Sequence, residues 1–174
     1  MSTEEFAWTI EKLGKKHGRE HFSCGNAALD DFLKTFARQN DSRGLGRTYV
    51  AVRSRDSQVT GYYTVAAGAI QFEVLPDHLA RSLPRYPLPV LLLARLAVDL
   101  RSQRKGLGEH LLLDALARAT QIEQEIGIHA VVVEAIDENA GRFYRRYGFE
   151  ALKDNLLHLI LSMKAVRKLF PSRE

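Results

Sequence analysis

A basic loop that contains two glycines is the part of this sequence with the clearest capacity for chemistry. It carries Arg101, Arg104, Lys105, Gly106 and Gly108 between an apolar segment and a segment of helical character. The first N–H groups of a helix lack intrahelical partners, and the helix macrodipole adds partial positive charge there. Glycine lets backbone approach a ligand without an intervening Cβ, while Arg and Lys add charge around it. The loop predicts a site for a pyrophosphate or several phosphates.

The spacing of the glycines separates this loop from two common nucleotide-binding motifs. No Gly-Lys-Ser/Thr follows, and Leu111 stands where a Gly-x-Gly-x-x-Gly loop needs its third glycine. What remains is Gln103-x-x-Gly106-x-Gly108. The alternative to a ligand site is an ordinary surface loop whose glycines serve turn geometry alone.

Apolar segments on either side of the loop give the order strand, loop, helix. Residues 90–98 are a near-continuous apolar run, as expected for a strand buried on both faces. After the loop, a stripe at helical spacing leads to Gly127, a predicted C-cap. The stripe comprises Leu107, Leu111, Leu112, Ala115, Leu116, Ala119, Ile122 and Ile126.

The next two predicted elements are a strand and a helix with an aromatic face. A strand rich in β-branched residues is predicted over 129–136. A short amphipathic helix is then predicted from Asp137 to Gly148, where glycine ends it. Its apolar face carries Ala140, Phe143, Tyr144 and Tyr147.

The remaining pattern predicts an α/β sandwich with a mixed sheet. Asn26 is a suitable N-cap for a helix with an apolar face. A second helix is expected over 75–83, begun by Pro76. The apolar face of the helix after Asn26 comprises Leu29, Phe32, Leu33, Phe36 and Ala37. The other strands are expected over 8–13, 48–52, 59–70, 149–152 and 156–163.

Composition indicates one globular domain, residues 1–174, with 45% hydrophobic residues and a net charge of +4. This charge permits a polyanionic partner without requiring one. A single cysteine excludes an internal disulfide, and no leader or spanning segment is evident, so we expect a cytoplasmic protein with no membrane association. His17, His21 and Cys24 match no zinc pattern, so we expect no metal.

These motifs together resemble the GNAT acetyltransferases. Gln103-x-x-Gly106-x-Gly108 is similar to the Q/R-x-x-G-x-G/A signature of that family, and Ala140, Phe143-Tyr144 and Gly148-Phe149 are similar to its N-x-x-A-x-x-F-Y-x-x-x-G-F element. One departure is Asp137, where the family often has asparagine, with Asn139 two positions later. The resemblance implies the GNAT (acyl-CoA N-acyltransferase) fold, with a mixed, mostly antiparallel sheet of about six to seven strands and about four helices.

The resemblance also implies acetyl-coenzyme A as co-substrate and assigns residues to it. The strand at Leu96, Ala97 and Val98 is expected to bond the pantetheine arm and face the thioester oxygen. Asn139 is expected either to contact this arm or to cap its own helix. The implied cofactor-binding residues are Leu96, Ala97, Val98, Gln103, Arg104, Lys105, Gly106, Leu107, Gly108, Asn139 and Phe143.

Acetyl transfer from a thioester to an amine needs a proton for the departing thiolate. Tyr144 is the expected general acid, because a phenol with a pKa of about 10 is protonated at neutral pH, and the family places a tyrosine there. Its alternative role is core packing beside Phe143. Glu134 is a candidate base, although a strand glutamate is more often solvated or paired with arginine. Without a base, an α-amine of pKa about 7.7–8.0 is a better acceptor than lysine.

Further sequence similarity indicates one branch of the family, the TacT/AtaT-like toxins of type II toxin–antitoxin modules. It lies in residues 22–33, 37–39, 47–50 and 94–99, and with the motifs covers roughly residues 5–163. The branch implies acetylation of the α-amine of aminoacyl-tRNA, inhibition of translation, a ribbon-helix-helix antitoxin and a homodimer. Candidate contacts to tRNA phosphates are Arg38, Arg43, Arg95, Arg142, Arg145 and Arg146.

Two other functions stay open at this point. One is acetylation of a small amine or a protein N-terminus with no toxin role. The other is a module that binds acetyl-coenzyme A or a partner without turnover, which Tyr144 argues against because binding alone does not require the phenol. Arg95 is an ambiguous candidate for tRNA contact, because an arginine in a buried strand can instead be paired with another residue of the protein for structural reasons.

Overall fold

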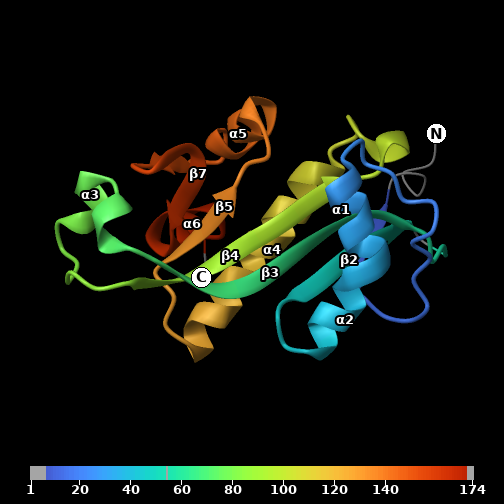
Figure 1. Ribbon diagram of the computed structural model, residues 1–174, viewed down its shortest axis with the longest axis horizontal. Coiled ribbons are helices and arrows are strands. Elements are labelled where there is room, and N and C mark those ends of the chain that lie inside the picture. Colours follow the sequence, from blue (N-terminus) through green and yellow to red (C-terminus); the bar gives the residue numbers. More distant parts are fainter. Residues whose placement is uncertain (1–6, 54, 172–174) are drawn as a thin grey trace. The chain divides into compact units, whose positions relative to one another are not determined.

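The computed structural model describes residues 7–53 and 55–171, in which strands and helices alternate along the chain (Figure 1). The elements are β1 (Trp8–Lys12), α1 (Ala27–Asp31), the π-helical segment η2 (Phe32–Phe36), α2 (Ala37–Ser42), β2 (Arg47–Arg53), β3 (Val59–Ile70), η3 (Phe72–Val74), α3 (Asp77–Ala80), β4 (Leu88–Val98), η4 (Leu100–Ser102), α4 (Leu107–Glu125), β5 (Ala130–Glu134), α5 (Glu138–Arg145), β6 (Glu150–Leu152), β7 (Asn155–Ser162) and α6 (Met163–Leu169).

The strands form a seven-stranded sheet in the order β1-β2-β3-β4-β5-β7-β6. β4 and β5 pair in parallel, whereas β1–β2, β2–β3, β5–β7 and β6–β7 are antiparallel. The β4–β5 register ends at Leu93↔Val133, so β4 continues beyond its last pair with β5. The predicted mixed, mostly antiparallel sheet is confirmed.

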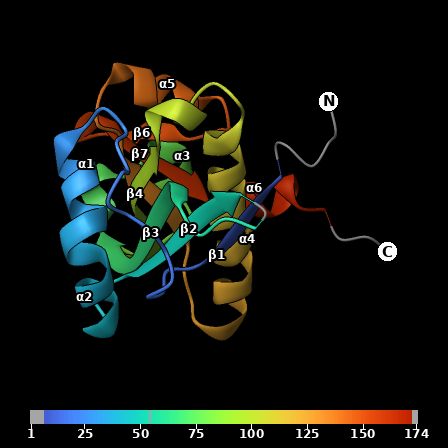
Figure 2. The ribbon, with the colours of Figure 1, turned by 90° about the vertical axis from the view of Figure 1, so that its right-hand side faces the viewer.

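The chain divides into two compact units. The first consists of Met1–Ala66 and Ala94–Ala115, and the second of Ala67–Leu93 and Leu116–Glu174. Within the first unit, α1 and α2 cover one face of β2 and β3, and the beginning of α4 lies on the other face (Figure 2). The core of the first unit contains Leu13, Phe22, Phe32, Leu33, Ala37, Val50, Val52, Val59, Tyr62 and Ala97. The core of the second contains Ile70, Leu75, Leu88, Val90, Ala130, Val132, Leu152 and Ile160.

The helix predicted after Asn26 is present but changes its winding. The Asn26 side chain accepts a hydrogen bond from the Leu29 N–H at 3.1 Å, which confirms the predicted cap. In η2 the Ala37 N–H donates to the Phe32 carbonyl five residues back, so this turn holds an extra residue. Phe32 and Ala37 are buried, but Phe36 is 43% exposed. The prediction of a core role for Phe36 is wrong because it assumed uninterrupted α-helical spacing.

Helix α4 begins earlier and ends earlier than predicted. Leu107 and Gly108 belong to its first turn rather than to the loop. The predicted stripe is buried from Leu107 to Ala119, but Ile126 lies beyond the helix and is 64% exposed. Gly127 does not have the positive φ of a left-handed C-cap, so both predictions for this end are wrong.

The C-terminal helix α6 was not predicted. The strand expected over 156–163 ends at Ser162, whose Oγ accepts a hydrogen bond from the Ala165 N–H at 3.2 Å. This N-cap turns the chain into a helix that buries Met163 and Val166. From the sequence alone Met163 is indistinguishable from strand, because its apolar side chain continues the run of β7.

Candidate functional site

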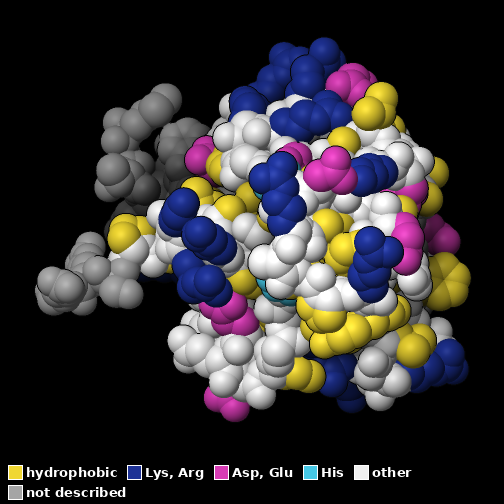
Figure 3. All heavy atoms as spheres, turned by 90° about the vertical axis from the view of Figure 1, so that its left-hand side faces the viewer, with side chains coloured by type: hydrophobic (Ala, Val, Ile, Leu, Met, Phe, Trp, Pro, Cys, Tyr) yellow, Lys and Arg dark blue, Asp and Glu magenta, His cyan; other side chains and the backbone are white. Residues whose placement is uncertain are grey.

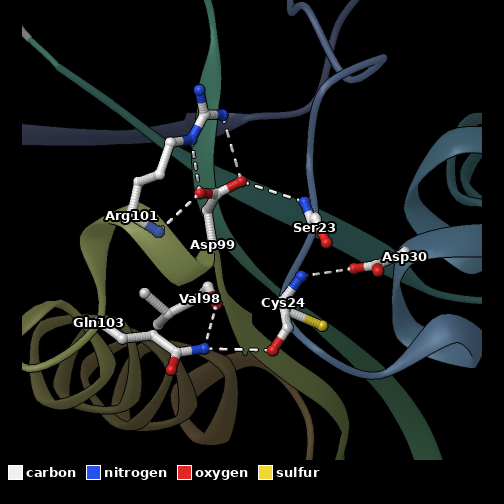
Figure 4. Close-up of polar contacts among 7 residues, drawn as sticks. All are labelled: Ser23, Cys24, Asp30, Val98, Asp99, Arg101 and Gln103. Carbon is white, nitrogen blue, oxygen red and sulfur yellow. Dashed lines mark hydrogen bonds and ion pairs between the residues drawn. The ribbon is translucent and has the colours of Figure 1, made fainter.

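Asp99 fastens the start of the basic loop. Its carboxylate accepts hydrogen bonds from the backbone N–H groups of Ser23 and Arg101, both at 3.0 Å, and from Nε of Arg101 at 3.0 Å (Figure 4). Burial alone would raise the pKa of Asp99, but these hydrogen bonds and the Arg101 charge lower it. An ionised carboxylate therefore joins the end of β4 to the segment at Ser23.

Sequence reasoning gave Asp99 no function of its own. The available signal was an aspartate directly after an apolar strand, because such a side chain often accepts a hydrogen bond from the N–H two residues later. The Arg101 N–H lies at that spacing.

Gln103 connects the loop to the same N-terminal segment. Its Nε2 donates to the Val98 carbonyl at 2.9 Å and to the Cys24 carbonyl at 3.2 Å (Figure 4). The Cys24 N–H in turn donates to Asp30 Oδ1 at 2.8 Å. The amide of Gln103 thus holds the loop in place, and a direct contact to a cofactor stays a prediction.

The surroundings of Cys24 disfavour the reactive thiolate. Burial, and next the hydrogen bond with Asp30, raise the pKa of its thiol to about 11. Since the thiolate is the reactive form, the protonated thiol packs as a small apolar group.

The turn between Gln103 and α4 fits a pyrophosphate. Arg104 and Gly106 have φ of 62° and 86°, and a Cβ on Gly106 would meet no atom within 4 Å. Glycine is therefore favoured by the backbone conformation and not by crowding. The turn leads into the 19-residue helix α4, whose first N–H groups have no intrahelical partners. Arg104 and Lys105 are exposed beside it.

The second half of β4 is more open than predicted. Ala94 is exposed and Leu96 and Val98 are half-buried, so the expectation of a strand buried on both faces holds only for its first half. Ala97 belongs to the core of the first unit. Residues 94–98 lie beyond the last pair with β5, which suits the main-chain contacts predicted for them.

In the second unit, Tyr144 lies on α5 with its ring in the core. The tyrosine is 5% exposed and packs edge-on against Phe143 and Phe149, with ring centroids 5.1 and 5.7 Å away. Burial raises the pKa of the phenol above its usual value, so the hydroxyl stays protonated. Among the described residues, no side chain or backbone group forms a hydrogen bond with it. A protonated hydroxyl without a protein partner suits a proton donor.

The start of α5 explains the departure at position 137. The Asp137 side chain accepts a hydrogen bond from the Ala140 N–H at 2.8 Å and is the N-cap. The capping role considered for Asn139 is therefore wrong, and Asn139 is an exposed residue of the first turn. Gly148, with φ of 99°, follows the helix as predicted. Glu134 ends β5, is exposed and stands opposite His158.

The six candidate arginines divide between the two units. In the first, Arg38 and Arg43 are exposed, and the Arg95 guanidinium lies 3.6 Å over the Phe32 ring. None of these three forms an ion pair with a carboxylate of the described chain. Arg95 thus stacks on an aromatic ring of its own unit, and its contact with tRNA stays a prediction.

In the second unit, the arginines of α5 differ in their availability. Arg145 donates to Glu138 Oε1 at 2.8 Å and to the Leu156 carbonyl at 2.7 Å, so two of its five N–H donors are already engaged. Arg146 lies 5.7 Å from the Phe143 ring, and Arg142 is exposed. Figure 3 shows Lys and Arg side chains gathered over α5 at the top of this face, with acidic side chains among the basic groups below.

Within residues 7–53 and 55–171, no three His, Cys, Asp or Glu side chains are grouped to hold a metal ion. None of the described helices has the length and apolar character needed to cross a bilayer.

Comparison with known proteins gives the relationship of the chain. A model of the acetyltransferase (GNAT) domain matches residues 89–158. The tRNA-acetylating toxin of Mycobacterium tuberculosis is 41% identical over 148 residues, which are 85% of this chain and 87% of that protein. The chain belongs to the GNAT acetyltransferase family. It has the fold of this family and is an acetyltransferase.

Solved structures of GNAT toxins are similar over nearly their full length. KacT with a tyrosine-to-phenylalanine mutation has a TM-score of 0.89 and 29% identity, covering 94% of this chain and 99% of KacT. AtaT complexed with acetyl-methionyl-tRNA has a TM-score of 0.88 and 30% identity, covering 95% and 100% of the two chains. AtaT has also been solved with acetyl-coenzyme A and with the C-terminus of its antitoxin AtaR.

Proposed function

We propose that this protein transfers the acetyl group of acetyl-coenzyme A to the α-amine of an aminoacyl-tRNA and so inhibits translation. The observation that carries the proposal is 41% identity with a tRNA-acetylating toxin over most of both chains. A relative with a TM-score of 0.88 is solved with acetylated methionyl-tRNA. The local geometry adds a turn suited to pyrophosphate and a protonated phenol.

Acetyl-coenzyme A supplies the activated acyl group, and this chain supplies position and electrostatics. Backbone N–H groups of residues 104–108, with Arg104 and Lys105, would bind the pyrophosphate. Leu96, Ala97 and Val98 would bond the pantetheine arm through their backbone, with Asn139 and Phe143 as further contacts. Gln103, Leu107 and Gly108 would keep the loop and the first helical turn in position.

In the reaction, the amine nitrogen forms the new C–N bond as the C–S bond breaks. Tyr144 donates its proton to the departing sulfur and is reprotonated from solvent, while the amine gives up its extra proton to water. A backbone N–H near Leu96–Val98 would stabilise the carbonyl oxygen as it gains negative charge. The exposed Glu134 is the candidate for a base that acts through water.

The Tyr144→Phe variant tests the role of the phenol, because it removes only the hydroxyl. We expect it to fold, to bind acetyl-coenzyme A as the wild type does, and to lose about 10²- to 10⁴-fold in turnover, the range for general acid catalysis. Transfer of labelled acetyl to charged tRNA measures the rate. Tyr147→Phe, which removes a hydroxyl one turn along the same aromatic cluster, is the matched control.

The two parts of the proposal can fail separately. Unchanged turnover of Tyr144→Phe would exclude this tyrosine as the acid. If wild type labels free amines but leaves charged tRNA unlabelled, the acceptor is a small amine or a protein N-terminus and the toxin function is wrong.

Further parts of the proposal concern the state of the protein in the cell. By analogy with AtaT bound to AtaR, we propose a ribbon-helix-helix antitoxin as partner, and we propose a homodimer. We also propose a cytoplasmic location, because charged tRNA is the proposed acceptor. Residues 1–174 are proposed to act as one domain, because β3, β4 and α4 each run from one compact unit into the other.

A further inference from the structure

The π-helical segment places an aromatic side chain on the surface of the first unit. The extra residue in η2 leaves Phe36 43% exposed while its neighbour Ala37 is buried. π-Helical turns occur frequently at functional sites. Figure 2 shows α2 extending α1 along the outer side of the strands. The ring of Phe36 thus has solvent beside it on a helix that is otherwise anchored to the core.

The irregular turn is supported by a residue from a distant part of the sequence. Arg19 Nη1 donates to the Leu33 carbonyl at 2.8 Å and lies 3.5 Å from the Lys34 carbonyl. These carbonyls lie in the π-helical turn. Burial, and next the positive charge of Arg38, lower the pKa of Arg19, so two guanidinium groups lie near each other here. Arg19 and Arg38 therefore bring two positive charges close to η2.

Arg43 shares the face of Phe36. Residues 36, 40 and 43 are related by the i, i+4, i+7 spacing of one helix face. The nearby carboxylate of Asp41 is already engaged, because it accepts from Arg47 Nη1 at 3.2 Å and from the Thr48 N–H at 3.4 Å. The Arg43 guanidinium has no ion-pair partner among the described residues. An exposed ring and an unpaired cation thus lie along one side of α2.

This combination fits single-stranded RNA better than a protein or a double helix. A protein interface normally has a contiguous apolar centre, whereas the exposed residues from Lys34 to Arg43 are polar or charged except for Phe36. Paired RNA keeps its base faces stacked, while an unpaired base can stack on an aromatic side chain with its phosphate on an arginine. The amino acid of a charged tRNA is attached at a single-stranded 3′ end.

We propose that Phe36 and Arg43 bind this 3′ end, the ring stacking on a base and the guanidinium contacting a phosphate. The inference rests on the proposed function and adds the residues that recognise the acceptor. It distinguishes Arg43 from the other candidate arginines by its position beside an exposed aromatic ring. Phe36 and Arg43 bind and position the tRNA and take no part in the chemical step.

The test compares one large and one small acceptor of the same amino acid, the charged tRNA and the amino-acid amide. Phe36→Leu should lower kcat/KM for charged tRNA by roughly 5- to 100-fold, the effect of losing one base–aromatic stack, and leave the amide reaction unchanged. Phe36→Trp should restore activity on tRNA. Tyr86→Leu, which removes an aromatic ring that is 61% exposed elsewhere, is the matched control.

Salt dependence separates the two residues. Arg43→Gln should lower kcat/KM for charged tRNA and flatten its log–log dependence on salt by about 0.7, as expected for one lost contact to a single-stranded phosphate. Phe36→Leu should leave this slope unchanged because stacking releases no counterions. Arg53→Gln, at the exposed end of β2, controls for loss of one positive charge.

Several results would overturn the inference while the proposed function stands. These are equal kcat/KM for Phe36→Leu and Tyr86→Leu on charged tRNA, an equal loss on tRNA and on the amide, or a loss confined to antitoxin binding. A wild-type protein that acetylates no charged tRNA would instead reject the proposed function itself.

Discussion

Asp99→Asn should destabilise the protein although the two side chains have nearly the same shape. The wild-type carboxylate is buried and accepts four hydrogen bonds, two of them from the Arg101 guanidinium. An asparagine amide turns one acceptor into a donor, so one N–H that faces it loses its partner. We expect a loss of about 1–3 kcal/mol in the free energy of unfolding, the cost of an unsatisfied buried group. For a chain of this length, 2 kcal/mol corresponds to a fall in Tm of about 4–8 °C.

The pH dependence of the lost unfolding free energy tests whether the loss arises from the charge of Asp99. The pKa of Asp99 is lowered in the folded protein, so its contribution is fully present above the unfolded pKa of about 3.9 and disappears as pH falls through the folded pKa. The free energies of unfolding of wild type and variant, measured with urea, should therefore differ by the full amount at pH 7. This difference should shrink below about pH 4. Asp56→Asn, whose exposed carboxylate accepts one bond from the Gln58 N–H, is the control.

The same variant should weaken binding of acetyl-coenzyme A, because Asp99 holds the start of the loop. Titration calorimetry at pH 7 measures this directly. Equal unfolding free energies for wild type and Asp99→Asn at pH 7, or a difference that stays constant through the acidic range, would refute the role assigned to this carboxylate.

Two more substitutions probe the loop itself. Gln103→Ala removes the Nε2 hydrogen bonds to the Val98 and Cys24 carbonyls. The KM for acetyl-coenzyme A should therefore rise several-fold, while kcat should change little. An unchanged KM would show that these bonds do not position the loop. Gly106→Ala should cost about 1 kcal/mol of stability, because its φ of 86° is unfavourable for a residue with Cβ, and should weaken cofactor binding. Gly127→Ala is its control, since no atom lies within 4 Å of an added Cβ and its φ is not positive, and thermal unfolding should find it neutral or slightly stabilising; equal losses for both glycines would contradict the argument from backbone conformation.

The parts of the fold that the sequence predicted are those set by local periodicity. The strand β4, the stripe of α4 from Leu107 to Ala119 and the Asn26 cap each depend on residues within one or two turns, and each is confirmed. The failures have nonlocal or competing causes. Phe36 is exposed because the π-helical turn shifts the helix face, and that turn is supported by Arg19, which lies in another segment.

The same distinction applies to the candidate site. Gly106 and Tyr144 could be named from motifs, since a local backbone conformation favours glycine at 106 and the proposed chemistry needs a proton donor at 144. Asp99 could not be ranked from sequence, because its function depends on Ser23, which is 76 residues away in the chain. Gln103 likewise matches a family motif, yet its amide reaches Cys24 across 79 residues.

These contacts bear on how the loop can bind a phosphate group. A loop with positive charge and glycine is flexible when isolated, and ordering it on a ligand would subtract from the binding free energy. Asp99 and Gln103 attach the residues that lead into the turn to the segment at Ser23 and Cys24 before any ligand arrives. The turn is therefore preorganised by residues outside the glycine motif, and we expect its affinity for a phosphate group to depend on the N-terminal segment as well as on its own cations.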